Sequence, residues 1–175
     1  MKSDWKLKAL ALAIVVQLLV LAGELVGANY PLWTGQKIRL EVQPVDPRSL
    51  FRGNYARLNY QISTVKRCDK KPDRRLRRGE VVYVHLQPDT QGIMRAHDFS
   101  VEQPAAGAFI RGRVIRMEVD CPEVEVRYGI EAYFLPREKA LALEKELRRE
   151  KAVASVMVAA NGKAALLGVE SAAAP

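Results

Sequence analysis

Residues 9–28 read ALALAIVVQLLVLAGELVGA, a run of twenty residues in which Gln17 and Glu24 are the only polar side chains. A helix rises about 1.5 Å per residue, so such a run spans roughly 30 Å, the thickness of the hydrocarbon core of a bilayer. The run also lacks the amphipathic pattern of a helix that packs on a soluble core. It therefore predicts a transmembrane anchor over residues 9–30, with the lipid bilayer as the partner of residues 9–28.

The residues before this run predict its orientation. Three basic side chains precede it, namely Lys2, Lys6 and Lys8. Because positive charges beside a membrane helix stay on the cytoplasmic side, residues 1–8 are expected to form a basic cytoplasmic stub and the rest of the chain to face outward. Cleavage of a signal peptide after Ala28 is the alternative, although the apolar run is long for one. Both alternatives export the C-terminal part of the chain.

One face of the predicted anchor carries its unusual residues. Gln17 and Glu24 are seven positions apart and share this face, with Gly23 and Gly27 beside Glu24. Small residues four positions apart let helix backbones approach closely. The face therefore predicts contact with another membrane protein. The alternative is that Glu24 reaches the outer interface and the glycines have no such role.

The positive charge of the chain is concentrated in one segment. The net charge is +8, from 28 basic and 20 acidic residues. Eight of the basic residues form a basic loop: Lys66, Arg67, Lys70, Lys71, Arg74, Arg75, Arg77 and Arg78. Such a cluster attracts anionic lipid or an acidic envelope component, or it is a solvated connection. Nucleic acid is disfavoured because the loop lacks aromatic residues for base stacking and lies outside the cytoplasm in this topology.

The two cysteines, Cys68 and Cys121, lie in loop-like contexts. An even number of cysteines in an oxidising compartment permits one disulfide between them. A zinc site that also used His85 and His97 would lack the usual ligand spacing. The sequence therefore predicts a possible disulfide, no metal site and no cofactor.

Alternating apolar and polar residues predict that residues 36–170 form a single β-rich domain, followed by a loose tail at 171–175. The predicted strands are 37–45, 55–62, 81–86, 93–101, 108–119, 123–134, 153–160 and 163–169. Asn161-Gly162 between the last two predicts a hairpin with a type I′ turn. Residues 136–151 have the apolar spacing of a helix. The expected fold is mainly β with one α-helix in the C-terminal half, as an antiparallel sheet or a partly open barrel or sandwich, behind one transmembrane helix.

Residues 53–60 read GNYARLNY, which closely resembles the signature of the GDYXXLXY family. The preceding VDPRSLFR at 45–52 and the later RYGIEAYFLP at 127–136 resemble the lead-in and the second block of that family. The resemblance spans nearly the whole chain. It implies a bacterial inner-membrane anchor with an extracytoplasmic domain, and it implies no particular activity. Together with the orientation predicted from the basic flank, the expected protein has a single span, a cytoplasmic N-terminus and a periplasmic domain.

Asn54 stands where the family has aspartate, and this departure bears on chemistry. An amide keeps the hydrogen bonds of a turn but carries no proton and is not an ionised metal ligand. The position is therefore expected to be structural. In the strand that follows, Leu58 and Tyr60 are expected to face the core, with Tyr55 and Arg57 on the other face.

The signature and the second block also supply the candidate binding residues. Tyrosine and arginine on an exposed sheet face are typical of a binding surface, and equally of a polar face braced by salt bridges. The residues concerned are Asp46, Arg48, Arg52, Gly53, Asn54, Tyr55, Arg57, Leu58, Tyr60, Tyr128, Glu131 and Tyr133.

Two classes of function remain open. The anchor, its polar face and the basic loop favour a membrane-anchored extracytoplasmic accessory or binding protein of the bacterial envelope. The alternative is an envelope hydrolase with a serine or carboxylate site. The sequence contains no Gly-x-Ser-x-Gly, no His-Glu-x-x-His and no phosphate-binding glycine loop. No catalytic residue is therefore assigned.

Overall fold

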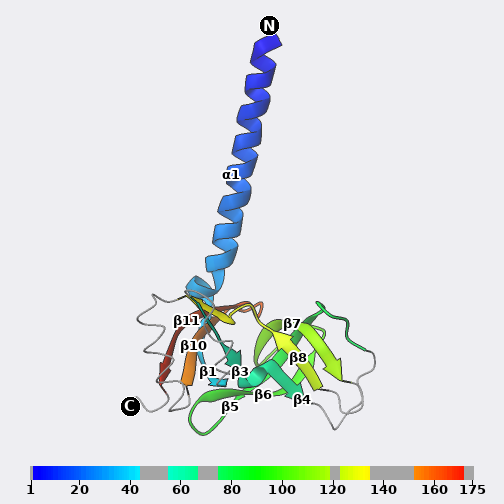
Figure 1. Ribbon diagram of the computed structural model, residues 1–175, viewed down its shortest axis with the longest axis vertical. Helices are drawn as coiled ribbons and strands as arrows, with labels where there is room; N and C mark the ends of the chain where they lie inside the picture. Colours follow the sequence, from blue (N-terminus) through cyan, green and yellow to red (C-terminus); the bar gives the residue numbers. More distant parts are fainter. Residues whose placement is uncertain (1, 44–54, 67–74, 119–122, 135–151, 172–175) are drawn as a thin grey trace.

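The structure is a computed structural model, and it describes residues 2–43, 55–66, 75–118, 123–134 and 152–171. A long helix, α1 (Lys2–Thr34), rises from a β-rich body (Figure 1). From Leu7 to Leu25 its large apolar side chains are exposed, because the body covers only the end of the helix. The helix is long and apolar enough to cross a membrane, as predicted.

The body consists of short strands whose apolar residues alternate with polar ones. Its described elements are β1 (Gln36–Gln43), β2 (Tyr55–Arg57), β3 (Asn59–Tyr60), the 3-10 turn η1 (Gln61–Ser63), β4 (Thr64–Lys66), β5 (Val81–Pro88), β6 (Ile93–Ser100), β7 (Ala108–Glu118), β8 (Glu123–Arg127), β9 (Ala132–Phe134), β10 (Ala152–Val158) and β11 (Ala164–Ser171). β2 and β9 form a separate two-stranded sheet.

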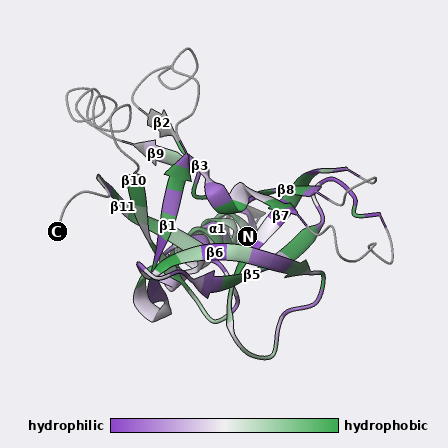
Figure 2. Ribbon diagram, turned by 90° about the horizontal axis from the view of Figure 1, so that it is seen from below, coloured by the Kyte–Doolittle hydropathy of each residue, from purple (hydrophilic) through white to green (hydrophobic). Residues whose placement is uncertain are grey.

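The main sheet has the strand order β11-β10-β1-β6-β5-β7-β8-β4, with β3 paired to β1. It curls into a half-barrel, seen from below in Figure 2 with α1 end-on behind it. The prediction of an antiparallel sheet is wrong at one place, because β1 and β6 are parallel and the sheet is mixed. The other pairings are antiparallel, and the direction of β6 follows from its hairpin with β5.

The core lies on the concave side of this curl. It takes the inward-facing residue of each alternating strand, as a sheet buried on one face requires. Fully enclosed side chains come from strands that are far apart in sequence: Leu40, Val84, Ile110, Val124 and Val156. The predicted core positions Leu58 and Tyr60 are also buried, at 2% and 1% exposure.

Two predicted strands are divided in the structure. Residues 55–62 form β2, β3 and part of η1, because β2 pairs with β9 whereas β3 pairs with β1. Residues 123–134 are divided into β8 and β9 by a turn at Gly129, whose φ is +87°. In both cases the chain changes its pairing partner, which alternation along one segment does not reveal. The helix predicted at 136–151 lies outside the described residues, and the helix that the structure does describe is the N-terminal α1.

The hairpin at Asn161-Gly162 is present, but its turn is not type I′. That turn needs positive φ at both central residues, and of the described residues only glycines, here Gly162, have positive φ. Instead, Gly162 N–H donates to Ala159 O at 2.8 Å and Ala159 N–H donates to Lys163 O at 2.9 Å. This is a three-residue loop, a type I turn closed by a left-handed glycine. The loop from Asp89 to Ile93 between β5 and β6 has the same pattern.

Candidate functional site

The two sequence blocks that carry the family resemblance pair with each other in space. β2 and β9 run antiparallel, with Ala56 opposite Tyr133 and Arg57 opposite Ala132. The next residue, Leu58, donates its backbone N–H to Glu131 O at 2.7 Å. The signature and the second block therefore form one unit, although about seventy residues separate them in the chain.

Two tyrosines fasten this unit to the body by reciprocal hydrogen bonds. The Tyr60 hydroxyl donates to Ile130 O at 2.7 Å, and the Tyr128 hydroxyl donates to Ile62 O. Both side chains are buried, at 1% and 8% exposure. Each hydroxyl satisfies a backbone carbonyl of the segment that contains the other tyrosine, so the pair acts as a clamp between η1 and the turn before β9.

Glu131 holds the turn that presents these carbonyls. Its carboxylate accepts the backbone N–H groups of Tyr128 and Gly129, the latter at 2.9 Å. Burial, and then the negative charge of Glu131, raise the pKa of Tyr60 and of Tyr128 well above its ordinary value. Both phenols therefore stay protonated and act as donors, and neither is suited to carry a proton in catalysis.

A cleft of about 670 Å³ opens beside this clamp. Its polar lining comes from Asn59, Ser63, Glu125, Arg127 and Glu131, and its other lining residues are Leu58, Ile115, Val126, Gly129 and Ala132. The volume lies within the range of small-molecule sites. Charges of both signs suit a polar ligand or a segment of another protein.

Comparison with known proteins gives one match. The family model described as GDYXXLXY protein matches residues 17–169, which is most of the chain. The chain belongs to the GDYXXLXY family. No curated protein and no solved structure matched the chain.

Within the GDYXXLXY signature, Leu58 and Tyr60 belong to the core, and the Tyr60 hydroxyl also bonds the second block. Tyr60 was predicted as a core residue, and Tyr128 was predicted on an exposed sheet face, either a binding surface or a polar face braced by salt bridges. The second prediction is wrong for Tyr128, because its ring fills the core while its hydroxyl bonds Ile62. The sequence of the second block did not predict that Tyr128 is buried, because the direction of its side chain depends on the turn at Gly129.

The other predicted binding residues are placed only in part. Glu131 and Tyr133 are half-buried, and Tyr55 and Arg57 lie in β2 opposite β9. The remaining predicted residues lie outside the described part of the chain: Asp46, Arg48, Arg52, Gly53 and Asn54. Sequence reasoning did not predict Ser63 of η1, Glu125 of β8 or Arg127, the first residue of the second block, as lining residues of the cleft.

The cleft does not present an evident catalytic set. Ser63 Oγ accepts the Tyr60 N–H at 3.3 Å, and among the described lining residues no histidine or lysine could activate it. The described part of the chain also contains no group of three or more histidine, cysteine, aspartate or glutamate side chains placed to hold a metal. Within these residues, the arrangement can bind and orient a ligand through hydrogen bonds and charge.

The remaining predicted sites of the GDYXXLXY chain can be placed as follows. On α1, Gln17, Gly23 and Glu24 are exposed, whereas Gly27 is half-buried near the body. Four residues of the basic loop are described and exposed: Lys66, Arg75, Arg77 and Arg78. The rest of that loop, with Cys68 and Cys121, lies outside the described residues, so the possible disulfide stays a prediction.

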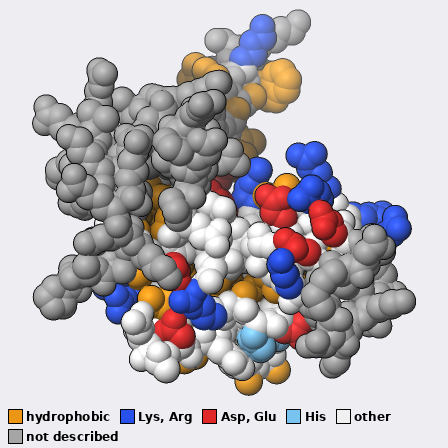
Figure 3. Space-filling view, turned by 60° about the horizontal axis from the view of Figure 1, so that its bottom comes forward, with side chains coloured by type: hydrophobic (Ala, Val, Ile, Leu, Met, Phe, Trp, Pro, Cys, Tyr) orange, Lys and Arg blue, Asp and Glu red, His pale blue; other side chains and the backbone are white. Residues whose placement is uncertain are grey.

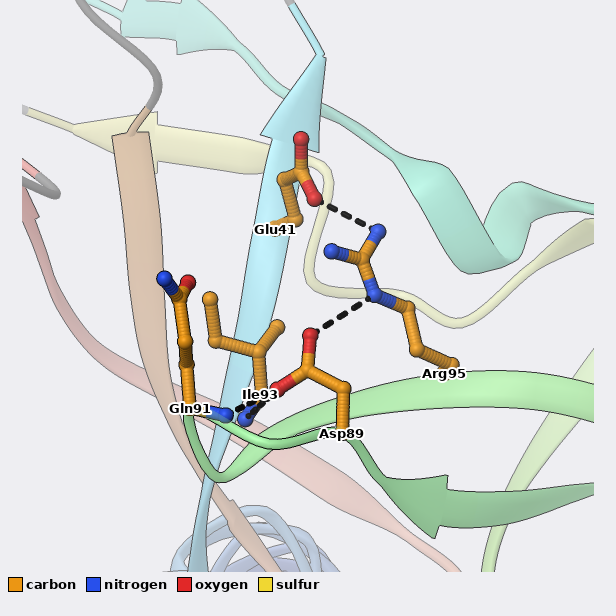
Figure 4. A network of polar contacts seen from close by, with 5 residues as sticks. All are labelled: Glu41, Asp89, Gln91, Ile93 and Arg95. Carbon is orange, nitrogen blue, oxygen red and sulfur yellow. Dashed lines mark hydrogen bonds and ion pairs between the residues drawn. The ribbon is translucent and has the colours of Figure 1, made fainter.

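A polar network that the sequence analysis did not predict lies at the parallel junction of the sheet (Figure 4). Arg95 bonds Glu41 at 2.6 Å and Asp89 at 3.1 Å. The other oxygen of Asp89 accepts the N–H groups of Gln91 at 2.9 Å and Ile93 at 3.0 Å. Burial opposes ionisation, but these backbone bonds and Arg95 lower the pKa of Asp89 below its ordinary value. The network ties β1 to the β5–β6 loop.

Proposed function

We propose that this GDYXXLXY protein is a membrane-anchored extracytoplasmic accessory or binding protein of the bacterial envelope. The observation that carries the proposal is the exposure of α1. Its apolar side chains, such as Leu12 at 65% and Leu19 at 67%, are exposed along the whole span. Leaving so much apolar surface in water is unfavourable, whereas a bilayer would cover it.

The polar face of α1 supports binding to another membrane protein. Gln17 and Glu24 are exposed on an otherwise apolar helix, and polar groups within a bilayer are costly unless they are paired. Gly23 has no neighbour within 4 Å of an added Cβ, so its surface is open to a partner helix. The partner proposed here is therefore a transmembrane helix with a hydrogen-bond donor opposite Glu24.

The topology is tested by fusing alkaline phosphatase, which is active only outside the cytoplasm, to the C-terminus. We expect an active phosphatase and an inactive β-galactosidase at the same position. The same fusion without residues 1–34 is the control, and it should be inactive as phosphatase. An inactive phosphatase with an active β-galactosidase on the full chain would overturn the topology, and with it the proposed function.

The partner is tested by photo-crosslinking in native membranes. Benzoylphenylalanine replaces Val20, which shares the face of Glu24, or Leu19, which lies on the opposite face by helical periodicity. We expect a defined cross-linked product from position 20 that is absent at position 19 and is weakened by Gln17→Ala/Glu24→Ala. The matched control Leu19→Ala/Val26→Ala should keep the product. Equal products from both positions would contradict a docking face.

The second candidate function is an envelope hydrolase, and the observation that favours it is Ser63 in a cleft with Glu125 and Glu131. Its hydroxyl would need a base to activate it. Arg127 is the only basic side chain among the described lining residues, and its guanidinium stays protonated and does not act as a base. A fluorophosphonate probe, which labels activated serines, tests the serine form of this hydrolase. Labelling of the full-length protein that Ser63→Ala abolishes, and that Ser100→Ala leaves intact, would favour the hydrolase.

A further inference from the structure

A second cavity, of about 350 Å³, lies where α1 meets the body. The helix contributes Gly27, Ala28 and Pro31 to its lining. The body contributes four cations, which we call the junction cations: Arg111, Arg113, Arg127 and Lys163. Among the described residues that line this cavity there is no carboxylate. The basic loop of residues 66–78 is a different feature of the chain.

Strand register brings the junction cations together. Arg113 of β7 stands directly opposite Arg127 of β8, and Arg111 lies two positions earlier on the same face of β7. Like charges directly opposite each other destabilise an antiparallel pair. The β10–β11 loop adds Lys163, because Arg111 N–H donates to Gly162 O at 2.8 Å and holds the loop there. The fold therefore assembles repelling charges, and a bound anion would relieve their repulsion.

At the other end of β7 and β8, basic side chains form ion pairs with carboxylates. There Arg116 pairs with Glu118 at 3.6 Å, and Lys66 pairs with Glu123 at 3.3 Å. Figure 3 shows basic and acidic side chains interspersed on the face of the body seen from below. At the junction, by contrast, Arg113 donates to the Gly79 carbonyl at 2.9 Å, and no described carboxylate forms an ion pair with the four cations.

The cavity also lies at a defined depth of the anchor. Gly27 and Ala28 end the apolar run of α1, and Pro31 is buried against the body. If α1 spans the bilayer, this end of the run is at the level of the lipid headgroups. We propose that the junction cations bind the phosphate of an anionic phospholipid in the leaflet that faces the body. This inference rests on the proposed membrane anchorage.

The chemistry of the lining fits a lipid phosphate. Guanidinium groups donate paired hydrogen bonds to phosphate oxygens, and three of the four cations are arginines. The helix side of the cavity is lined by the uncharged residues Gly27, Ala28 and Pro31. A lipid bound by its headgroup can place its acyl chains in the bilayer beside α1. A free phosphate ion would leave that apolar side uncovered.

The test uses the full-length protein in maltoside micelles doped with phosphatidylglycerol or with phosphatidylcholine. Retained lipid is counted by native mass spectrometry, and the thermal midpoint of the body is recorded. We expect phosphatidylglycerol to be retained and to raise the midpoint, whereas phosphatidylcholine does neither. Arg111→Gln/Arg113→Gln should weaken retention about 30-fold, from roughly fivefold per cation at an anionic surface. The matched control Lys66→Gln/Arg116→Gln should retain phosphatidylglycerol like the wild type.

Three results would overturn the inference. They are equal retention of both lipids, unchanged retention by the double variant, or an equal rise in midpoint with inorganic phosphate at the same concentration, which would favour a free anion. If the double variant does not fold, Lys163→Gln at the exposed loop should still weaken retention about fivefold. Carbonate extraction of native membranes separates the two proposals, because an extraction-resistant protein without lipid selectivity contradicts this inference alone.

Discussion

The helix α1 and the β body use the same apolar residue types and place them in opposite environments. Leu19 of α1 is 67% exposed, whereas Leu40 of β1 is fully buried. In strands of the body such as β5 a buried residue alternates with a more exposed one, whereas β10 is buried on both faces. In α1 the apolar residues continue around the helix. The body therefore buries its apolar surface by itself, whereas most of the apolar surface of α1 is left exposed and makes this helix a candidate membrane anchor.

The two regions meet at a tight junction. Gly35 donates its N–H to Pro31 O at 2.9 Å, and an added Cβ there would lie 2.3 Å from that oxygen and 3.0 Å from the backbone of Val158. The last turn of α1 therefore packs on β10 without room for a side chain. This contact ties the direction of the helix to the sheet and holds the junction cations beside the end of the apolar run.

The largest expected effect concerns the two cysteines, both of which belong to the β-rich part of the chain and not to α1. Cys68 and Cys121 lie outside the described residues, and an even number of cysteines in an oxidising compartment permits one disulfide between them. We expect a disulfide, and we expect Cys68→Ser/Cys121→Ser to lower the unfolding free energy by about 4 kcal/mol. Urea unfolding in detergent measures this. Two free thiols in the unreduced, denatured protein would contradict it.

The next prediction compares one leucine from each region. Leu40→Ala removes a fully buried side chain and should lower the unfolding free energy of the body by about 3 kcal/mol. Leu19→Ala removes an exposed side chain of α1 and should leave the body within about 0.5 kcal/mol of the wild type. Both are measured by urea unfolding in detergent. A comparable loss from Leu19→Ala would show that α1 packs on the body.

Two glycines give a smaller contrast. In Gly112→Ala the new Cβ would lie 2.2 Å from a methyl of Val126 and 3.0 Å from the ring of Tyr128, so we expect a loss of roughly 2 kcal/mol. Gly23→Ala meets nothing within 4 Å and should be neutral for the body. The thermal midpoints of the two variants provide the measurement. An unchanged midpoint for Gly112→Ala would contradict the close packing of β7 on β8.

Removing one hydrogen bond of the tyrosine clamp should lower the unfolding free energy by about 1 kcal/mol. Tyr60→Phe keeps the buried ring but leaves the Ile130 carbonyl without its donor. Tyr30→Phe in α1 is the matched control, because its side chain is 38% exposed and outside the clamp. In urea unfolding, Tyr60→Phe should have a lower midpoint than the wild type, whereas Tyr30→Phe should have the wild-type midpoint. Equal midpoints for both would show that the hydroxyl of Tyr60 contributes nothing to stability.

The smallest effect concerns acid stability. The pKa of Asp89 is lowered in the folded state, so its ionised form stabilises the fold above its unfolded pKa of about 4 and this contribution is lost as the pH falls below that value. Asp89→Asn should therefore have its largest deficit in thermal midpoint at neutral pH and approach the wild type near pH 3. A deficit that does not change with pH would mean that the Asp89 charge is not involved.

Local sequence patterns predicted those helices and strands that a single continuous segment identifies by its own apolar pattern. The continuous apolar run gave α1, alternation gave the positions of β1, β5, β6 and β7 within a few residues, and the apolar runs on either side of Asn161-Gly162 gave β10 and β11. The hairpin at Asn161-Gly162 was also found from its sequence. Its turn type was wrong, because the pairing of Ala159 with Lys163 requires a loop of three residues instead of two.

The candidate site was harder to predict because its residues come from distant segments. Leu58 and Tyr60 could be assigned to the core from alternation alone. Tyr128 could not, because its direction depends on the turn that Glu131 holds at Gly129. The cleft residues Ser63 and Glu125 belong to no motif, so their proximity follows from strand pairing.

By itself the sequence determined that an apolar helix precedes a body of β-strands. These patterns depend on the transfer of apolar side chains out of water and on the different periodicities of helix and strand. Only the tertiary structure decided that β1 and β6 run parallel, that the signature pairs with the second block, and that Arg113 stands opposite Arg127. These features depend on which strands meet and in what register. That choice is made by the packing of the whole core and by the backbone hydrogen bonds of segments far apart in the chain.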